Sequence, residues 1–309
     1  LLAAIPDYTP PALPTLDVRA VVCDSRRIAP GDLFVAVAGL TSDGHRYIPD
    51  AIGRGAVAIV GERQREEIIG LPAGFPYAQV PDARLALAWL AAAALGFPAR
   101  RMRIIGVTGT DGKTTTTNLI YSILSAAGIP AGMISTVNAR IGDQEYDTGL
   151  HTTTPEALDV QRYLSQMVAA GSRVAVLEAT SHGLAQKRVS ACEFDLAVVT
   201  NITHEHLDFH GSLAAYREAK ASLFWELSRS ARKAGVAKVA VLNADDSSFE
   251  LLRPIPADRH LTYGLQAPAD LTAEDIVADT KGTRFTARTP AGRFDLASHL
   301  VGHYNVYNL

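Results

Sequence analysis

The residues that most directly suggest chemistry lie in a glycine-rich segment near the middle of the chain, GTDGKTT at positions 109–115. The apolar run RIIGVT precedes it, and an amphipathic stretch begins directly after Gly112. Glycines let backbone N–H groups close around phosphate oxygens, and the N-terminus of a following helix adds partial positive charge. Lys113 would add a full charge, and the Thr114 hydroxyl could bind Mg²⁺. The sequence therefore predicts a strand, a phosphate-binding loop and a helix, with an ATP-type phosphate as the ligand.

The match to the general phosphate-loop pattern is incomplete, because that pattern has glycine where this chain has Val107. Gly109, inside the loop, partly compensates. An ordinary strand-to-helix turn is the alternative interpretation. Asp111 is unusual here, since a carboxylate beside bound phosphate would repel it. We expect its side chain to point outward or to meet a cation.

Two further polar clusters follow apolar runs, EATSHGL at 178–184 and NITHEHLDFHG at 201–211. The second holds three histidines and two acids within residues 204–210, which does not suit a buried core. Such a cluster could be a set of zinc ligands, a solvated loop or part of a phosphate-transfer site. The phosphate loop favours the last, because Mg²⁺ takes oxygen ligands and occasionally imidazole. Lys220 follows on a predicted helix, where most lysines are solvated.

The elements that must position these clusters alternate between strand and helix. Predicted strands cover residues 104–108, 132–135, 174–178, 196–200, 239–243 and 261–263. This alternation predicts an α/β domain with a mainly parallel sheet wrapped by helices and ligands at the carboxyl ends of the strands. After Asp270, short alternating segments with turns at Lys281-Gly282 and Ala291-Gly292 predict a small antiparallel appendage.

A smaller α/β domain is predicted before this one. Strands are expected at residues 18–23, 33–37 and 56–60, with helices between 47 and 55 and from 82 to 95. Residues 96–103 contain Pro98 and three arginines and form the predicted boundary. We therefore predict two domains, residues 1–98 and 99–309.

Composition limits the class of partner. The chain has 309 residues, of which 48% are hydrophobic, and a formal net charge of −3. This near-neutral balance argues against nucleic acid or an anionic membrane as the main partner. No apolar run is long enough to span a bilayer, so the cytoplasm is the expected location. Cys23 and Cys192 are far apart on apolar stretches and are expected to be buried free thiols rather than a disulfide.

Taken together and in order, these motifs resemble those of the Mur ligases. The segments that carry the resemblance are VTGTDGKTT at 107–115, E-x-x-S-H-G-L at 178–184, TNITHEHLDFHG at 200–211, Y-x-x-A-K at 216–220 and GHYNVYN at 302–308. The resemblance runs from about residue 18 to residue 309, and it is closest to the members that add the third amino acid during peptidoglycan synthesis.

The resemblance implies an ATP-dependent amide ligase. Members of the family activate a peptide carboxylate with ATP to an acyl phosphate, which an incoming amino-acid amine attacks. It implies UDP-N-acetylmuramoyl-L-Ala-D-Glu as acceptor and L-lysine or meso-diaminopimelate as the added amino acid. We expect a monomer, although the sequence leaves the oligomeric state open. Which amino acid is added, and which group takes the proton of the amine, stay open.

The resemblance also implies roles for residues of the ATP and metal site. Lys113 would hold the β- and γ-phosphates, and Thr114 would bind one Mg²⁺. Glu178 and His206 would bind a second Mg²⁺. Lys220 matches a lysine that is carbamylated in the family, which turns an amine into a carboxylate that can bind Mg²⁺. The implied ATP contacts are Gly109, Thr110, Asp111, Gly112, Lys113, Thr114, Thr115 and, for adenine, Asn305.

The resemblance implies a second set of residues, for the sugar-peptide. In the first domain, Ser25 matches a pyrophosphate or uridine contact, and the Asp24-Ser25-Arg26 motif by itself is an ordinary turn. The implied substrate contacts are Cys23, Ser25, Leu40, Thr41, Ser42, Thr152, Thr153, Thr154, Thr180, Gln186 and Arg188. The Arg188 guanidinium suits a phosphate or carboxylate because it donates two parallel hydrogen bonds.

The sequence departs from the family pattern in a few places. Asp111, Thr180 and Tyr304 replace a usual Asn, Ser and Phe, and none of these changes removes an essential group. The chain stops at Leu309, where the family's third domain, which receives the amino acid, is expected to begin. We therefore expect this chain alone to bind nucleotide but to ligate poorly. Two rival functions are a folylpolyglutamate-synthetase-like ligase, against which the Asp24-Ser25-Arg26 domain argues, and a non-catalytic nucleotide-binding relative.

Overall fold

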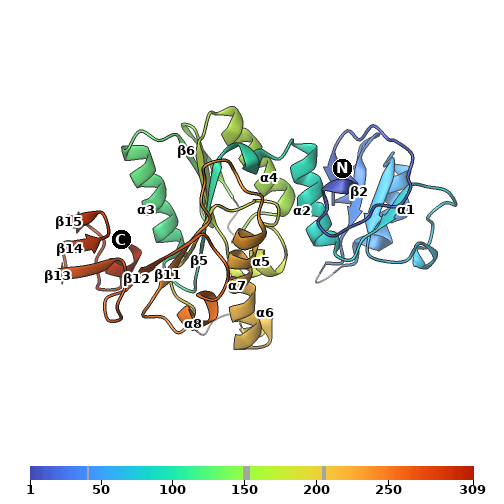
Figure 1. Ribbon diagram of the computed structural model, residues 1–309. Coiled ribbons are helices and arrows are strands. Elements are labelled where there is room, and N and C mark those ends of the chain that lie inside the picture. The colour runs from blue at the N-terminus through green and yellow to red at the C-terminus, as the bar shows by residue number, and fades with distance from the viewer. Residues whose placement is uncertain (40–41, 149–153, 204–206) are drawn as a thin grey trace. The chain divides into compact units, whose positions relative to one another are not determined.

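The computed structural model of the chain describes residues 1–39, 42–148, 154–203 and 207–309. The chain forms two compact units, and each unit is built from more than one segment (Figure 1). The first consists of Leu1–Pro98, Glu156–Arg162 and Gln186–Ala191. The second consists of Ala99–Pro155, Tyr163–Ala185 and Cys192–Leu309. The predicted domain limits at residues 98 and 99 stay a prediction.

The first unit contains a four-stranded parallel sheet in the order β1-β2-β3-β4. Its strands and helices are β1 Val21–Val22, β2 Leu33–Ala36, α1 Ile48–Gly53, β3 Ala58–Gly61, β4 Tyr77–Gln79 and α2 Ala83–Ala94. Short 3-10 turns cover Leu2–Ala4, Ser25–Arg27, Gly44–Tyr47 and Arg65–Glu67. A further one, Pro98–Arg101, begins at the last residue of this segment and continues into the second unit. Leu33 and Val35 pack on the side of α2, whereas Phe34 and Ala36 pack on the side of α1. The two helices therefore cover opposite faces of a sheet that is buried on both sides.

The second unit is organised around an eight-stranded sheet in the order β12-β11-β10-β5-β9-β6-β7-β8. Its strands are β5 Arg103–Thr108, β6 Ala131–Ile134, β7 Asn138–Ile141, β8 Gln144–Asp147, β9 Val174–Glu178, β10 Leu196–Val199, β11 Val239–Asn243 and β12 Arg259–Tyr263. All neighbours from β12 to β6 pair in parallel, and β7 and β8 add antiparallel strands at one edge. The predicted mainly parallel sheet is confirmed, and the β7–β8 pair is an addition that the sequence did not indicate.

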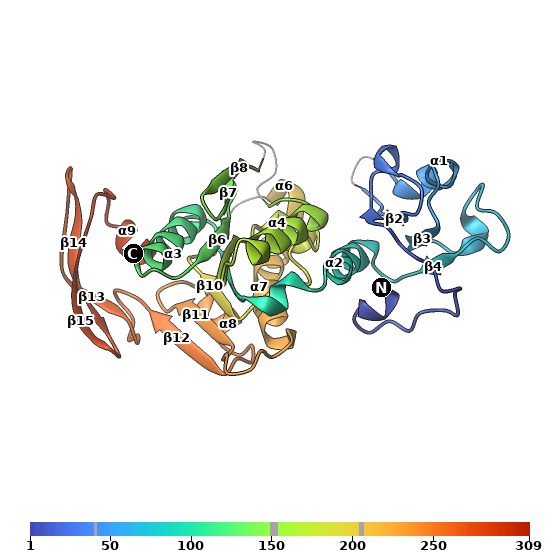
Figure 2. The ribbon, with the colours of Figure 1, turned by 90° about the horizontal axis from the view of Figure 1, so that it is seen from above.

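Helices cover both faces of this sheet (Figures 1 and 2). The helices are α3 Lys113–Ala126, α4 Ala157–Ala169, α5 Ser181–Ala185, α6 Leu207–His210, α7 Leu213–Arg229, α8 Phe249–Leu252 and α9 Asn305–Asn308. The residues of α4 up to Arg162 belong to the first unit. Ile120 and Leu124 of α3 pack against Ile105 and Val107 on one face. Gly106 lies on the other face, where an added Cβ would be 2.8 Å from Leu223 of α7. The central strand β5 is thus enclosed by α3 and α7.

The last part of the second unit is a separate three-stranded antiparallel sheet. Its strands are β13 Thr272–Asp279, β14 Gly282–Thr289 and β15 Gly292–Ser298, in that spatial order. Figure 2 shows this sheet beside α9 at one end of the unit. The predicted antiparallel appendage and both of its turns are confirmed. Among the described residues, no helix combines the length and the apolar character needed to cross a membrane.

Candidate active site

The three polar clusters that the sequence singled out all start at the carboxyl ends of neighbouring strands. β5 leads into the phosphate loop and lies between β9 and β10, with Val107 opposite Glu178 and Thr108 opposite Val199. Parallel strands bring their carboxyl ends to one edge of the sheet. The sheet therefore places residues 108–114, 178–184 and 200–203 side by side.

The phosphate loop has the conformation that its glycines permit. Gly112 caps the N-terminus of α3 with φ of +79°, in the left-handed region, and an added Cβ would lie 2.2 Å from Oδ1 of Asn308. At Gly109 an added Cβ would lie 1.8 Å from Oγ1 of Thr200. The Lys113 Nζ donates to the Thr110 carbonyl at 2.7 Å, so the ammonium lies against the loop itself. The predicted strand, loop and helix are confirmed as a structure.

Hydrogen bonds hold the loop against the segment that follows β10. The Thr110 N–H donates to the Asn201 carbonyl at 2.7 Å, and the Asp111 N–H donates to Oδ1 of the same residue at 3.1 Å. The Thr200 hydroxyl donates to the Asp111 carbonyl at 2.6 Å. Asp111 is anchored by its backbone while the residue stays exposed, in agreement with the expectation that it points outward.

Glu178 and Thr114 meet at the start of α3. The Thr114 hydroxyl is 3.0 Å from both carboxylate oxygens of Glu178, and the Thr136 N–H donates to one of them at 3.0 Å. Glu178 is 2% exposed. Burial raises the pKa of its carboxyl group, and the hydrogen bonds from Thr136 and Thr114 oppose that rise. A buried carboxylate beside a hydroxyl is a pair of hard oxygen donors, which is the donor type that Mg²⁺ prefers.

Within the described part of the chain, Glu178 has no ion-pair partner, and no group of three or more His, Cys, Asp or Glu side chains gathers to hold a metal. His206, the predicted third contributor, lies outside the described residues. The Glu178 carboxylate and the Thr114 hydroxyl fit a hard divalent cation. A buried carboxylate without a positive partner is costly, and a bound cation would supply that partner.

Lys220 is deeply buried rather than solvated, so the interpretation from its position on a polar helix is wrong. It is 1% exposed on α7, and its ammonium donates to the Gly109 carbonyl in the phosphate loop. Its Nζ lies 4.6 Å from the centroid of the Tyr216 ring. The helix begins at Ser212, whose side chain accepts a hydrogen bond from the Ala215 N–H, and this start places Lys220 two turns later against the loop.

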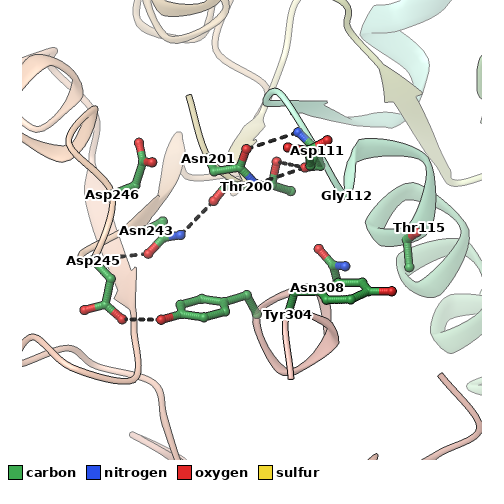
Figure 3. A pocket seen from close by; sticks show the side chains of 11 residues that line it. Asp111, Gly112, Thr115, Thr200, Asn201, Asn243, Asp245, Asp246, Tyr304 and Asn308 are labelled. Atoms are coloured by element: carbon green, nitrogen blue, oxygen red, sulfur yellow. Dashed lines mark hydrogen bonds between the residues drawn. The ribbon is translucent and has the colours of Figure 1, made fainter. Parts of the chain in front are cut away.

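A cavity of about 440 Å³ opens beside the phosphate loop. Figure 3 shows its lining, which comes from the loop, from the ends of β10 and β11 and from the C-terminal segment. The lining residues are Asp111, Gly112, Thr115, Thr200, Asn201, Asn243, Asp245, Asp246, Tyr304, Tyr307 and Asn308.

Asn305, the predicted adenine contact, does not line this cavity. Its Nδ2 donates to the Val301 carbonyl at 2.9 Å, and its Oδ1 accepts from Asn308 Nδ2 at 2.9 Å. The amide that reaches the cavity belongs to Asn308, and Asn305 fixes its orientation. Both residues are in the GHYNVYN motif, and the contact of Asn305 with adenine stays a prediction.

Asn243 and Asp245 are cavity residues that the sequence reasoning missed. Asn243 donates to the Thr200 carbonyl at 2.7 Å. Burial tends to raise the pKa of Asp245, but backbone N–H groups of Ala267 and Leu265 and the Tyr307 hydroxyl donate to its carboxylate, and the pKa falls below its usual value. Asn243 is the last residue of β11 and Asp245 follows two residues later, so the rule that ligands gather at strand ends could have found them.

The predicted sugar-peptide contacts divide between the two units. In the first unit, Ser25 is buried in a 3-10 turn that begins when the Asp24 side chain accepts from the Arg26 N–H at 3.0 Å, and Cys23 is half-buried beside it. Ser42 contacts the Tyr47 hydroxyl at 3.1 Å. Leu40 and Thr41 lie outside the described residues.

Gln186 and Arg188 belong to the first unit as well. Arg188 donates to Gln186 Oε1 at 3.0 Å and pairs with Glu156 at 2.7 Å. Burial lowers the pKa of its guanidinium, Glu156 opposes that change, and the nearby Arg84 adds to it. Arg84 donates to the same Gln186 Oε1 at 3.5 Å, so two guanidinium groups meet at Gln186, and a planar guanidinium suits a phosphate or carboxylate.

Thr154 and Thr180 belong to the second unit. Their hydroxyls are 2.9 Å apart, and the Gly183 N–H donates to Thr180 at 3.1 Å. Both side chains are buried beside the carboxyl end of β9. Thr152 and Thr153 lie outside the described residues.

The fold and the site define a phosphate-loop α/β protein with oxygen donors placed at the start of the helix that follows the loop. Residues 107–309 match the Mur ligase middle domain, and residues 17–94 match the Mur ligase family catalytic domain. The chain belongs to the Mur ligase family.

Particular relatives agree with this assignment. The chain is 46% identical to the UDP-N-acetylmuramyl-tripeptide synthetase of Roseiflexus sp. (strain RS-1), over 98% of this chain and 60% of that protein. It is 43% identical to the UDP-N-acetylmuramoyl-L-alanyl-D-glutamate--2,6-diaminopimelate ligase of Geobacillus thermodenitrificans (strain NG80-2), over 95% of this chain and 58% of that protein. A solved structure of a ligase with the latter name superposes with a TM-score of 0.80 at 32% identity, covering 94% of this chain and 58% of the other. The chain thus spans about 60% of the length of the curated relatives it matches.

Proposed function

We propose that this chain is the nucleotide-binding part of an ATP-dependent ligase that adds the third amino acid to UDP-N-acetylmuramoyl-L-Ala-D-Glu during peptidoglycan synthesis. The observation that carries the proposal is the contact between Thr114 and Glu178 at the start of α3. A phosphate loop alone suits any nucleotide-binding protein, whereas a buried carboxylate at its edge adds the metal donors that phosphate transfer needs. The names of the relatives supply the substrate class.

ATP would bind with its phosphates in the loop and its base in the neighbouring cavity. The backbone N–H groups around Gly112 and the ammonium of Lys113 would hold the phosphates. Lys113 has only to exchange the Thr110 carbonyl for a phosphate oxygen. The side chain of Asn308, oriented by Asn305, would contact the base.

Thr114, Glu178 and His206 would hold Mg²⁺, two ions in all, and Lys220 would join them once carbamylated. When bound, Mg²⁺ reduces the repulsion between the γ-phosphate and the acceptor carboxylate. Lys220 lies against the Gly109 carbonyl in the amine form described here, so its side chain already reaches the phosphate loop. Carbamylation would exchange a buried cation for a carboxylate that supplies oxygen donors.

The chain's remaining task is to orient the acceptor. The buried hydroxyls of Thr154 and Thr180 provide neutral hydrogen-bonding groups next to Glu178, and Arg188 provides positive charge for the acidic sugar-peptide. Attack of the peptide carboxylate on the γ-phosphate forms an acyl phosphate and releases ADP. Attack of the amino-acid amine then forms the amide and releases phosphate. We infer that the enzyme acts as a monomer in the cytoplasm.

The proposal is tested by amide formation from ATP, UDP-N-acetylmuramoyl-L-Ala-D-Glu and either L-lysine or meso-diaminopimelate, using the protein at its natural length. We expect ligation that depends on one of the two amino acids. Glu178→Gln should abolish it by removing a metal donor. Glu193→Gln is the matched control, because Glu193 is a buried carboxylate that pairs with Arg100 away from the loop. Equal activity of the two variants, or no ligation by the unsubstituted enzyme, would contradict the proposal.

A further inference from the structure

Tyr216 is a fully buried residue of α7 to which the proposed function gives no role. It is 0% exposed, and it stands four residues before Lys220, so the two side chains share one face of the helix. Its ring lies 4.6 Å from the Lys220 Nζ, and the His210 ring packs edge-on against it at 5.3 Å. Apolar packing alone would be satisfied by phenylalanine, so the hydroxyl needs a separate explanation.

The Tyr216 hydroxyl is 2.9 Å from Oγ1 of Thr110 in the phosphate loop. The same Oγ1 accepts a hydrogen bond from the Thr203 N–H at 2.9 Å. Thr110 is therefore the meeting point of three segments: the phosphate loop, helix α7 and the chain that follows β10. Residue 203 directly precedes the segment that contains His206.

The hydrogen bonds of Thr110 connect three of the four segments to which the proposed function assigns a metal or phosphate contact. The fourth segment is β9, which carries Glu178. The loop carries Lys113 and Thr114, α7 carries Lys220, and the third segment carries His206. A bond between two buried hydroxyls fixes the rotamer of each, because an unpaired buried hydroxyl is costly. The Thr110 backbone, in turn, supplies the carbonyl that holds the Lys113 ammonium.

We propose that Tyr216 is a positioning residue that sets the conformation of the phosphate loop for nucleotide through its hydrogen bond to Thr110. Its hydroxyl fixes the position of α7 relative to the loop, and its ring packs against the Lys220 ammonium on the same face of the helix. The proposal rests on the proposed function only in assuming that the loop binds ATP or ADP.

The test is a double-mutant cycle on the affinity for Mg²⁺-ADP, measured by calorimetry with the 309-residue chain. Tyr216→Phe keeps the ring and removes the hydroxyl, and Thr110→Val removes its partner. We expect Tyr216→Phe to weaken ADP binding roughly three- to tenfold, the range given by one buried hydrogen bond. Once Thr110 is Val, the same Tyr216→Phe change should weaken binding less than twofold, because the bond between the two hydroxyls is then already absent.

Tyr77→Phe is the matched control. Tyr77 is a buried tyrosine of the first unit whose hydroxyl donates to the Arg63 carbonyl, so its loss removes a comparable bond far from the loop in sequence. We expect Tyr77→Phe to lower the free energy of unfolding without changing ADP affinity. A merely structural Tyr216 would behave in the same way.

The outcomes separate this proposal from the proposed function. Unchanged ADP affinity in Tyr216→Phe, with tight binding by the unsubstituted chain, would overturn the role of Tyr216 alone. Additive effects of Tyr216→Phe and Thr110→Val would also overturn it, because the two hydroxyls would then act independently. Absence of nucleotide binding by the unsubstituted chain would overturn both.

Discussion

Replacing Gly112 by alanine tests whether the last glycine of the phosphate loop is needed for its backbone conformation and for the space beside it. Gly112 has φ of +79°, and a Cβ there would lie 2.2 Å from Oδ1 of Asn308. Gly128, just beyond the other end of α3, has φ of +70° and open space around its missing Cβ. The Gly128→Ala variant therefore measures the cost of the left-handed conformation alone, about 1–2 kcal/mol of unfolding free energy.

Gly112→Ala should show a larger loss of stability than Gly128→Ala and, in addition, a loss of nucleotide affinity. The new methyl group must displace the Asn308 side chain, which lines the cavity and donates to Asn305 at 2.9 Å. Losing that bond lowers the free energy of unfolding by about 1 kcal/mol. The displaced Asn308 amide would also lose its proposed contact with the base, and one lost hydrogen bond weakens ADP binding roughly fivefold.

The assay pairs chemical denaturation with calorimetric titration of Mg²⁺-ADP on both glycine variants. We expect a lower midpoint of unfolding for Gly112→Ala than for Gly128→Ala, and weaker ADP binding in Gly112→Ala only. Equal ADP affinity in the two variants would refute the placement of Asn308 over the loop.

Further substitutions and chemical probes test the charges and the thiols. Lys113→Ala should abolish ATP binding, because it removes the loop's full positive charge. Unchanged ATP affinity in a titration would contradict the role of Lys113 in holding the phosphates. Lys220→Ala should cripple ligation by the natural-length enzyme and be partly restored by acetate, whereas full activity without acetate would remove the carbamate from the mechanism. Burial raises the pKa of Cys23 to about 11 and raises that of Cys192 as well, so both thiols stay neutral at pH 8. Iodoacetamide should therefore label them slowly at pH 8, Cys23 faster as the pH approaches 11, and both quickly after unfolding; fast labelling of the folded chain would contradict their burial.

The central sheet could be predicted because its strands are buried on both faces and are therefore continuous apolar runs. β8 lacks that signature, since three of its four residues are exposed. β4 is a three-residue strand that follows a turn rich in glycine and proline. Such elements depend on neighbouring strands rather than on their own pattern, which is why the sequence did not indicate them.

Site residues at the ends of strands could be predicted from the sequence. Site residues that depend on how distant segments pack together could not. The cluster that begins with Glu178 was located by its position at the end of a predicted strand, and in the structure Glu178 contacts Thr114. The burial of Lys220 depends on how α7 docks against the loop, and polar residues around it, such as Arg217 and Glu218, gave no sign of this. That Asn308 lines the cavity and Asn305 does not depends on the orientation of a four-residue helix, which no periodicity reveals.

The most direct test of the central claim follows oxygen during a single ligation. UDP-N-acetylmuramoyl-L-Ala-D-Glu labelled with ¹⁸O in its acceptor carboxylate would be incubated with ATP, Mg²⁺ and the accepted amino acid. An acyl phosphate transfers one carboxylate oxygen to the released phosphate, so we predict ¹⁸O in inorganic phosphate in equal amount to the new amide. Amide formation with unlabelled phosphate would contradict activation of the carboxylate by ATP at this site.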